Sequence, residues 1–211
     1  PGQSGVAPPR LLLERAWYDG GLDIAKRAAE ASQVGDPTQE GDHIGPLFDR
    51  IQFDRVQAKI QTGLDEGAAL LAGGLGMPDG FEAGWYVKPT IFADVSHDMG
   101  IAQEEIFGPV VSVTTFKDEE EALAIANDTM YGLGAGVWSR DANTCYRFGR
   151  AIEAGRVWVN NHHAYPAHAA LGGDTHSDIG RETPTHMLDH HPHTHNNTVH
   201  HTPLTPPPPE L

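Results

Sequence analysis

The stretch Gln103-Glu104-Glu105-Ile106-Phe107-Gly108-Pro109-Val110 decides how the whole chain is interpreted. It places two adjacent carboxylates and an aromatic ring before a Gly-Pro pair, and a run of Val, Ser and Thr follows over 110–115. The Gly-Pro pair predicts a turn, and the β-branched run predicts a strand. Polar groups on a bend beside a rigid element are typical of functional sites. Taken alone, the stretch is better explained by a charged helix end before a strand.

Length, composition and charge exclude several classes of function. The 211 residues, of which 39% are hydrophobic, predict one domain or slightly more with a real core. The formal net charge of -15 argues against binding to nucleic acid or to anionic membranes, because both need clustered Lys and Arg. The single cysteine, Cys145, excludes an internal disulfide, and we expect a cytoplasmic protein. We recognise no signal peptide in the sequence and no apolar run long enough to span a bilayer, so we expect neither feature.

Helical and strand patterns alternate along the body of the chain. The clearest helix is 48–66, where Phe53, Val56, Ile60 and Leu64 form one apolar stripe. Further helices are predicted at 16–32, 118–127 and 141–154. Strands are predicted at 11–13, 68–72, 85–87, 90–92, 110–115, 136–139 and 156–160. The alternation predicts an α/β sheet covered on both faces.

Two glycine-containing segments are predicted to be irregular. Residues 41–46 are predicted to form a loop, and residues 73–76 are predicted to form a plain turn. The second segment, Gly-Gly-Leu-Gly, lacks the spacing of a phosphate-binding loop and does not lead into a helix.

The C-terminal part of the chain has a different composition. Most of the 13 histidines lie between residues 162 and 201, and the last ten residues are rich in proline. His191, His193 and His195 alternate, so they would share one face of a strand and could hold Ni, Cu or Zn. Because no carboxylate fixes these rings, we expect adventitious binding and no specific metal site, although a His-rich metal binder is an alternative.

Glu104-Glu105-Ile106-Phe107-Gly108-Pro109 resembles a motif of the aldehyde dehydrogenase superfamily. Further motifs extend the resemblance on both sides, at 45–53, 89–95, 126–133 and 155–160. The loop 3–10 is similar to the one around the family's catalytic cysteine. Residues 163–170 resemble bacterial members that act on small aldehydes such as acetaldehyde. The resemblance covers residues 2 to about 183.

The resemblance implies an α/β fold, a three-layer sandwich like the catalytic domain of the family, over residues 1–183. Residues 184–211 would be a degenerate remnant of the oligomerisation strand, which we expect to be poorly ordered; a folded chain would form a homo-oligomer. The family oxidises aldehydes to acids with NAD or NADP. A cysteine thiolate attacks the aldehyde carbon, fixed donors hold the oxyanion, and a Glu-activated water releases the acid.

The resemblance also implies roles for four residues near the cofactor. Glu105 matches the carboxylate that binds the hydroxyls of the nicotinamide ribose. A buried carboxylate that accepts hydrogen bonds from two hydroxyl groups is physically reasonable. Phe107 matches the aromatic residue that borders the nicotinamide. Gln52 and Arg55 match positions near the same ribose, although an exposed helix face explains them equally well. We expect the cofactor not to bind to this chain alone, because its phosphate-binding turn would lie before residue 1.

The chain departs from the family pattern where the chemistry would occur. Gly5 stands at the position of the nucleophilic cysteine, and a glycine has no side chain with which to attack. Cys145 is predicted to be structural, in a helix far along the chain. Tyr165 and Leu171 fall in the segment that lines the aldehyde tunnel in the family, with core packing as the alternative. We therefore expect an inactive fragment without an intact catalytic residue, or alternatively a non-catalytic assembly or binding module.

Overall fold

The computed structural model describes residues 2–166, 168–178, 180–182 and 196–199. These residues fall into two compact units, Pro1–Thr129 and Met130–Leu211, and each unit is described by itself. The predicted boundary between residues 183 and 184 lies at the edge of an undescribed stretch, so it stays a prediction.

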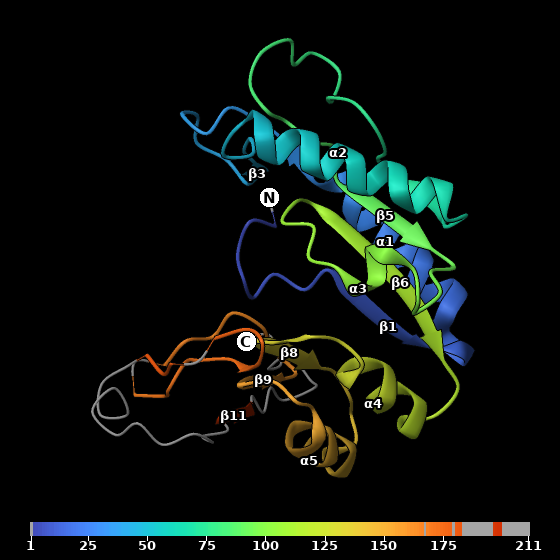
Figure 1. Cartoon of the computed structure of the whole chain (residues 1–211), viewed down its shortest axis with the longest axis vertical. Helices are drawn as coiled ribbons and strands as arrows, with labels where there is room; N and C mark the ends of the chain where they lie inside the picture. The colour runs from blue at the N-terminus through green and yellow to red at the C-terminus, as the bar shows by residue number, and fades with distance from the viewer. Residues whose placement is uncertain (1, 167, 179, 183–195, 200–211) are drawn as a thin grey trace, which may run out of the picture. The chain divides into compact units, whose positions relative to one another are not determined.

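The first unit is built on a four-stranded sheet with the strand order β1-β6-β5-β4 (Figure 1). Its strands are β1 (Arg10–Glu14), β4 (Ala69–Ala72), β5 (Thr90–Ala93) and β6 (Val110–Phe116). Strands β1 and β5 run parallel to the central strand β6, with Arg10 opposite Ser112 and Thr90 opposite Val110. Strand β4 is antiparallel to β5. The parallel pairs require crossover connections, which the helices supply.

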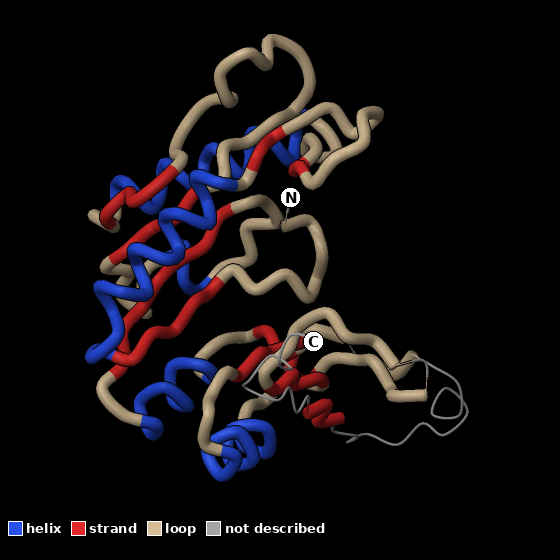
Figure 2. Tube along the Cα trace, turned by 180° about the vertical axis from the view of Figure 1, so that it is seen from behind, coloured by secondary structure: helices blue, strands red, loops and turns tan. Residues whose placement is uncertain are grey.

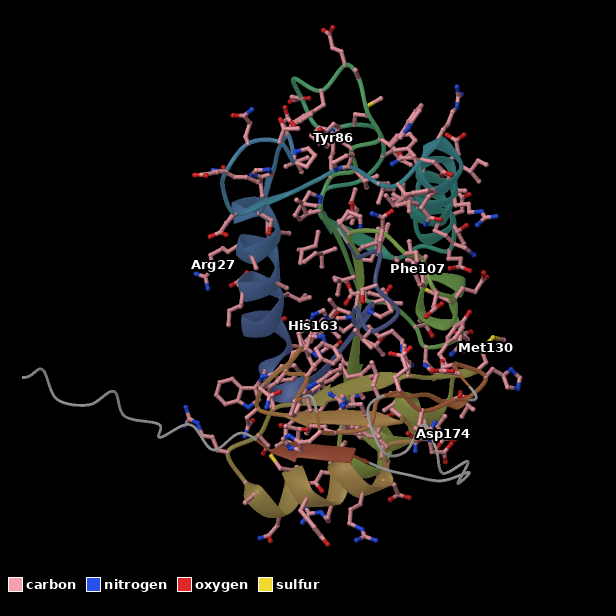
Figure 3. All side chains as sticks on the ribbon, turned by 90° about the vertical axis from the view of Figure 1, so that its left-hand side faces the viewer. Arg27, Tyr86, Phe107, Met130, His163 and Asp174 are labelled. Carbon is pink, nitrogen blue, oxygen red and sulfur yellow. The ribbon has the colours of Figure 1, made fainter. Side chains whose placement is uncertain are left out.

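Helices cover both faces of this sheet. Helix α1 (Tyr18–Ala31), which follows a short 3-10 turn at Arg15–Trp17, lies on one side of the strands, and α2 (Arg50–Asp65) lies on the other (Figure 3). The short helix α3 (Gly100–Gln103) packs beside α2. Helix α4 (Glu119–Asn127) follows β6. The predicted three-layer α/β arrangement is confirmed for this unit.

The core of the first unit lies between α2 and the sheet. Val56 and Ile60 of α2 are fully buried against Phe92, Ile101 and other apolar residues of the sheet and of α3. The remaining members of the predicted stripe, at positions 53 and 64, pack against the edge of the same cluster. The periodic stripe therefore predicted this face of the helix correctly.

The segment 85–87 was predicted to be a strand, and this prediction is wrong. Tyr86 and Val87 are buried, but the segment is irregular. The carbonyl oxygen of Trp85 accepts a hydrogen bond from Leu47 N, outside the sheet. Pro89, which follows, has no N–H to donate to a neighbouring strand. The apolar residues of this segment are buried by loop packing instead.

Residues 41–46 differ in part from the predicted loop. His43–Ile44 form the short strand β3, which pairs in parallel with β2 (Gln33–Val34). Two-residue strands give no periodic signal that a sequence pattern could reveal.

Residues 73–76 are irregular and form a bend, and they lead into no helix. The N–H groups of Gly74 and Gly76 donate to the side-chain oxygens of Thr90 and Gln57. These two donors, which a phosphate-binding loop would direct at a ligand, are thus already used within the fold.

The second unit contains the parallel sheet β11-β9-β8, formed by β8 (Gly134–Val137), β9 (Arg156–Val159) and β11 (Asn196–Val199). Helix α5 (Ala142–Ala151) packs against β8 and β9 (Figure 2). The short strands β7 (Tyr131–Gly132) and β10 (Asp174–Thr175) form an antiparallel pair.

Strand β11 lies within the tail 184–211, for which poor order was predicted. These four residues form a strand that pairs in parallel with β9, and the description of the tail as a poorly ordered remnant stays a prediction. Residues 183–195 and 200–211 lie outside the described residues. In the part of the chain that is described, none of the helices combines the length and the apolar character that crossing a membrane requires.

Candidate functional site

The site is centred on the segment that joins α3 to β6. Glu104 and Glu105 follow the end of α3, and the side chains then alternate in their burial. Glu105 is exposed, Ile106 is 3% exposed and enters the core, and Phe107 is 38% exposed. Phe107 has a φ of 55°, a conformation that is uncommon for a bulky residue. The buried Ile106 therefore presents the carboxylate and the ring on either side of it to the surface.

Gln52 of α2 holds this segment in place. Its Nε2 atom donates to the carbonyl oxygens of Ile106 and Phe107, each at 3.0 Å. Gln52 lies in the first turn of α2, where Asp49 caps the helix by accepting from Gln52 N at 2.7 Å. Asp49 thus fixes the backbone of Gln52, and the side chain of Gln52 in turn fixes the backbone of Ile106 and Phe107.

Two depressions border the segment. The first has a volume of about 480 Å³. It is lined by Gln3, Phe48, Asp49, Ile51, Gln52, Arg55 and Phe107. The second, of about 450 Å³, is lined by Glu105 and Phe107 together with residues of the loop 2–9, the sheet and α1. Phe107, which is labelled in Figure 3, lines both depressions. Gln52 and Arg55 share the first depression with it, and Glu105 shares the second.

Glu105 differs from the buried carboxylate that was expected, because its side chain is exposed. Glu105 lines the second depression, where the surrounding protein atoms partly desolvate its carboxylate. This partial burial raises the pKa of the carboxyl group. Arg55 is also exposed, on the helix face that lines the first depression.

The loop that carries Gly5 reaches the same surface. Gln3 Oε1 accepts a hydrogen bond from Phe48 N at 2.8 Å, so the loop is tied to the residue before the cap of α2. Residues Ser4 to Ala7 form a turn closed by the bond from Ala7 N to Ser4 O. Gly5 is exposed on this turn and offers no side-chain nucleophile.

Cys145, which was predicted to be structural, is a buried free cysteine. It is 5% exposed in α5, within the second unit. Its Sγ atom lies 3.5 Å from the carbonyl oxygen of Ser139, and Asn160 Nδ2 lies 3.9 Å from the same sulfur. The thiol is therefore packed within the fold.

Tyr165 and Leu171 lie in the second unit. Tyr165 is 43% exposed, and its ring packs edge-on against Trp158 with 5.5 Å between the ring centroids. Leu171 is half-buried and forms a two-way backbone bridge with Glu182. Tyr165 is thus partly packed and partly exposed, and both its predicted substrate role and the alternative of core packing stay open.

The sequence analysis missed Arg156, a charged residue that is 1% exposed in β9. Its Nη1 atom donates to Ala164 O, and its Nη2 atom donates to Ala169 O and Ala170 O. Its guanidinium also lies 5.3 Å from the ring centroid of Tyr165. Burial lowers the pKa of Arg156. An arginine at the start of a strand of apolar residues was the available signal.

Among the described residues, no group of three or more His, Cys, Asp and Glu side chains could hold a metal ion. His191, His193 and His195, the predicted adventitious ligands, lie outside the described residues.

Comparison with known proteins gives a consistent picture. A family model described as "Aldehyde dehydrogenase family" matches residues 1–196. An "Aldehyde dehydrogenase" of Paracoccus denitrificans is 52% identical over 204 residues, and an "Acetaldehyde dehydrogenase 2" of Cupriavidus necator is 51% identical over 204 residues. In both comparisons 96% of this chain aligns with 40% of the relative. The chain thus spans about 40% of the length of these curated relatives.

Solved structures agree with the relatives. The crystal structure of an aldehyde dehydrogenase from Bartonella henselae matches with a TM-score of 0.86 and 46% identity, over 90% of this chain and 40% of that one. A Mycobacterium tuberculosis aldehyde dehydrogenase complexed with NAD+ matches with a TM-score of 0.86 and 39% identity, over 90% of this chain and 39% of that one.

Proposed function

Since the chain belongs to the aldehyde dehydrogenase family, we propose that its first unit supplies the contacts to the nicotinamide half of NAD or NADP in an enzyme that oxidises an aldehyde to a carboxylic acid. The observation that carries the proposal is the grouping of Glu105 and Phe107 with the α2 residues Gln52 and Arg55 around adjoining depressions. When bound, the nicotinamide would accept a hydride from the substrate.

The residues fit such a group. The exposed carboxylate of Glu105 can accept hydrogen bonds from ribose hydroxyls, and the Phe107 ring offers an apolar face to a nicotinamide ring. Gln52 would contact the ribose through its side-chain oxygen, because its nitrogen already donates to two carbonyls. Arg55 lines the same depression, where its charge would favour an anionic cofactor.

Saturation-transfer NMR on the full chain tests this proposal, because it detects weak contacts of the kind that half a site makes. With nicotinamide mononucleotide as the probe, we expect transfer to the nicotinamide and ribose protons. Glu105→Gln and Phe107→Ala should each weaken the transfer. Glu82→Gln, at an exposed loop residue away from both depressions, is the matched control. Absence of transfer, or equal loss in the control, would remove the proposal.

We further propose that the chain as it stands does not turn over aldehydes. Gly5 carries no thiol, and the sulfur of Cys145 is packed within α5. Without a thiolate, no acyl group can be carried between the oxidation and hydrolysis steps. Acetaldehyde and NAD+ should therefore give no increase in absorbance from NADH, and a steady increase proportional to the chain's concentration would contradict the inactivity.

Tyr165 and Leu171 are proposed to line the path of the aldehyde, with the exposed ring of Tyr165 as the contact surface. We also propose that the chain associates into a homo-oligomer and that it is located in the cytoplasm. A defined dimer or larger species in light scattering after gel filtration supports the assembly; a monomer at all concentrations contradicts it.

A further inference from the structure

One face of α2 contacts the segment Gly100–Phe107 along its length. Three polar residues of α2 stand at intervals of seven, namely Gln52, Lys59 and Glu66, the last of these at the C-cap. Seven residues are nearly two turns of an α-helix, so the three side chains leave the helix on the same face and span about 21 Å along it. We call these residues the α2 row.

Each member of the α2 row binds a different part of the segment. Gln52 donates to the carbonyl oxygens of Ile106 and Phe107. Lys59 forms an ion pair with Glu104. Glu66, the third member, binds Gly100. Later residues of α2 therefore bind earlier residues of the segment, so the segment runs antiparallel to α2.

The third contact holds the start of the segment. Both carboxylate oxygens of Glu66 accept from Gly100 N, at 2.9 and 3.0 Å. This N–H is at the beginning of α3, where a helix leaves its amide groups unpaired. The row therefore fixes the segment at both ends and in the middle.

Apolar contacts complete this attachment. Ile101 and Ile106 of the segment are 0% and 3% exposed and pack against Val56 and Ile60 of α2 in the core cluster. The apolar side chains hold the segment against the helix, but hydrophobic contact is not directional. The polar contacts of the row are directional and set the register in which Glu105 and Phe107 face the surface.

The geometry points to Gln52, Lys59 and Glu66 as positioning residues that act together to fix the backbone from which Glu105 and Phe107 meet the cofactor. This inference rests on the proposed function for the roles of Glu105 and Phe107. The contacts of the α2 row with the segment are all made within the protein. Gln52 therefore acts first on the backbone of the turn, and the effect of its loss is present without a cofactor.

Hydrogen exchange of the full chain, without any cofactor, measures this order. Gln52→Met and Lys59→Met keep the length of the side chains and remove the polar contacts. Exchange in peptides covering residues 100–110 should become about fivefold faster in each, since a net hydrogen bond is worth about 1 kcal/mol. Peptides from β1 and β5 should keep their rates. The matched control is Gln61→Met, on the same helix, whose side chain donates to Asp65 and not to the segment.

Rescue separates positioning from general damage. Lys59→Arg keeps the positive charge and should retain the slow exchange. The exchanged pair, Lys59→Glu with Glu104→Lys, should recover protection that either single change loses. Equal acceleration in Gln61→Met, acceleration spread over the whole sheet, or no recovery in the exchanged pair would each overturn the inference.

The two proposals can fail separately. If nicotinamide mononucleotide shows no saturation transfer to the wild-type chain, the cofactor role of Glu105 and Phe107 fails, whatever the exchange rates show. If transfer is seen but the α2 row variants exchange like the wild type, the row has no positioning role and the proposed function stands.

Discussion

Gly2 lies so close to Gly108 that a β-carbon on Gly2 would sit 2.1 Å from the carbonyl oxygen of Gly108. Gly2 also has a φ of +76°, a conformation that side chains disfavour. The loop carrying Gly5 and the turn carrying Phe107 therefore meet backbone to backbone. This contact explains why residues of both segments line the second depression.

Gly108 faces the helix as well, and replacing it should destabilise the fold. A β-carbon at this position would lie 2.7 and 2.9 Å from the two methyl carbons of the buried Val56. We expect Gly108→Ala to lower the free energy of unfolding by about 2 kcal/mol through overpacking. Urea unfolding followed by circular dichroism measures this change.

Gly20→Ala is the matched control for this prediction. A β-carbon at Gly20, in the exposed part of α1, would meet no atom within 4 Å. Alanine should therefore raise the stability there, by about 0.5–1 kcal/mol. A similar loss in both variants would show that the contact with Val56 is not the cause.

The Glu105 carboxylate makes stability depend on pH in a definite direction. Because burial raises its pKa, the folded chain binds the proton more tightly than the unfolded chain. Stability contributed by this group thus falls as the pH rises from the unfolded pKa, about 4.3, through the raised folded value. Glu105→Gln should be more stable than the wild type above this window, and the advantage should vanish below it.

Urea unfolding at a series of pH values checks the Glu105 prediction. The exposed loop residue Glu82 gives the control variant, Glu82→Gln, which should track the wild type at every pH. A Glu105→Gln variant that is less stable than the wild type at neutral pH would show that the carboxylate is held by favourable contacts instead of being desolvated.

A thiol at position 5 should be open to reagents, whereas the natural thiol is not. Gly5 is exposed, and Cys145 is 5% exposed. Under native conditions we expect a disulfide reagent to label Gly5→Cys rapidly at one site and the wild type only slowly. Labelling after denaturation gives the total number of thiols, which should be two in Gly5→Cys and one in the wild type. Rapid labelling of the native wild type would contradict the packed position of Cys145 in α5.

Arg156 should be needed for the order of residues 164–170. It joins β9 to the carbonyl oxygens of Ala164, Ala169 and Ala170, all of which lose a donor in Arg156→Met. Ala164 O keeps a hydrogen bond from Trp158 Nε1, so the loss falls mainly on the other contacts of the guanidinium. We expect a loss of about 2 kcal/mol in the free energy of unfolding, since a hydrogen bond to a charged group contributes about 1.5–3 kcal/mol. Arg150→Met, at an exposed residue of α5, should cost much less.

Exchange in peptides that cover residues 161–170 localises the effect of Arg156→Met. Because a buried charge is itself expensive, an equally stable Arg156→Met variant would mean that removing the charge offsets the lost hydrogen bonds.

The sequence predicted those helices and strands in which apolar or β-branched residues recur at regular spacing. The stripe at 53, 56, 60 and 64 identified the buried face of α2, and the β-branched run identified β6 as a core strand. The segment 85–87 looked like a strand because its residues are apolar, and they are indeed buried. Burial and strand geometry are separate properties, and the hydrogen bond from Leu47 N to Trp85 O could not be inferred from either.

The sequence predicted which residues would form the candidate site, whose role stays a proposal, but it did not predict their contacts. Linked motifs singled out Glu105, Phe107, Gln52 and Arg55, and the structure places them around adjoining depressions. The sequence does not show that Gln52 binds carbonyls more than fifty residues away, because no local pattern records a contact between distant segments. The exposure of Glu105 and the burial of Arg156 likewise depend on tertiary packing.

The spacing of the α2 row has a consequence for recombining this chain with others. Inserting or deleting one residue in α2 between Gln52 and Glu66 would rotate one end of the row by about 100° relative to the other, so the contacts to Ile106 and to Gly100 could not both form. Chimeras should therefore exchange α2 and residues 100–108 as one cassette. Swapping either alone would leave a well-formed helix beside a segment that it no longer aligns.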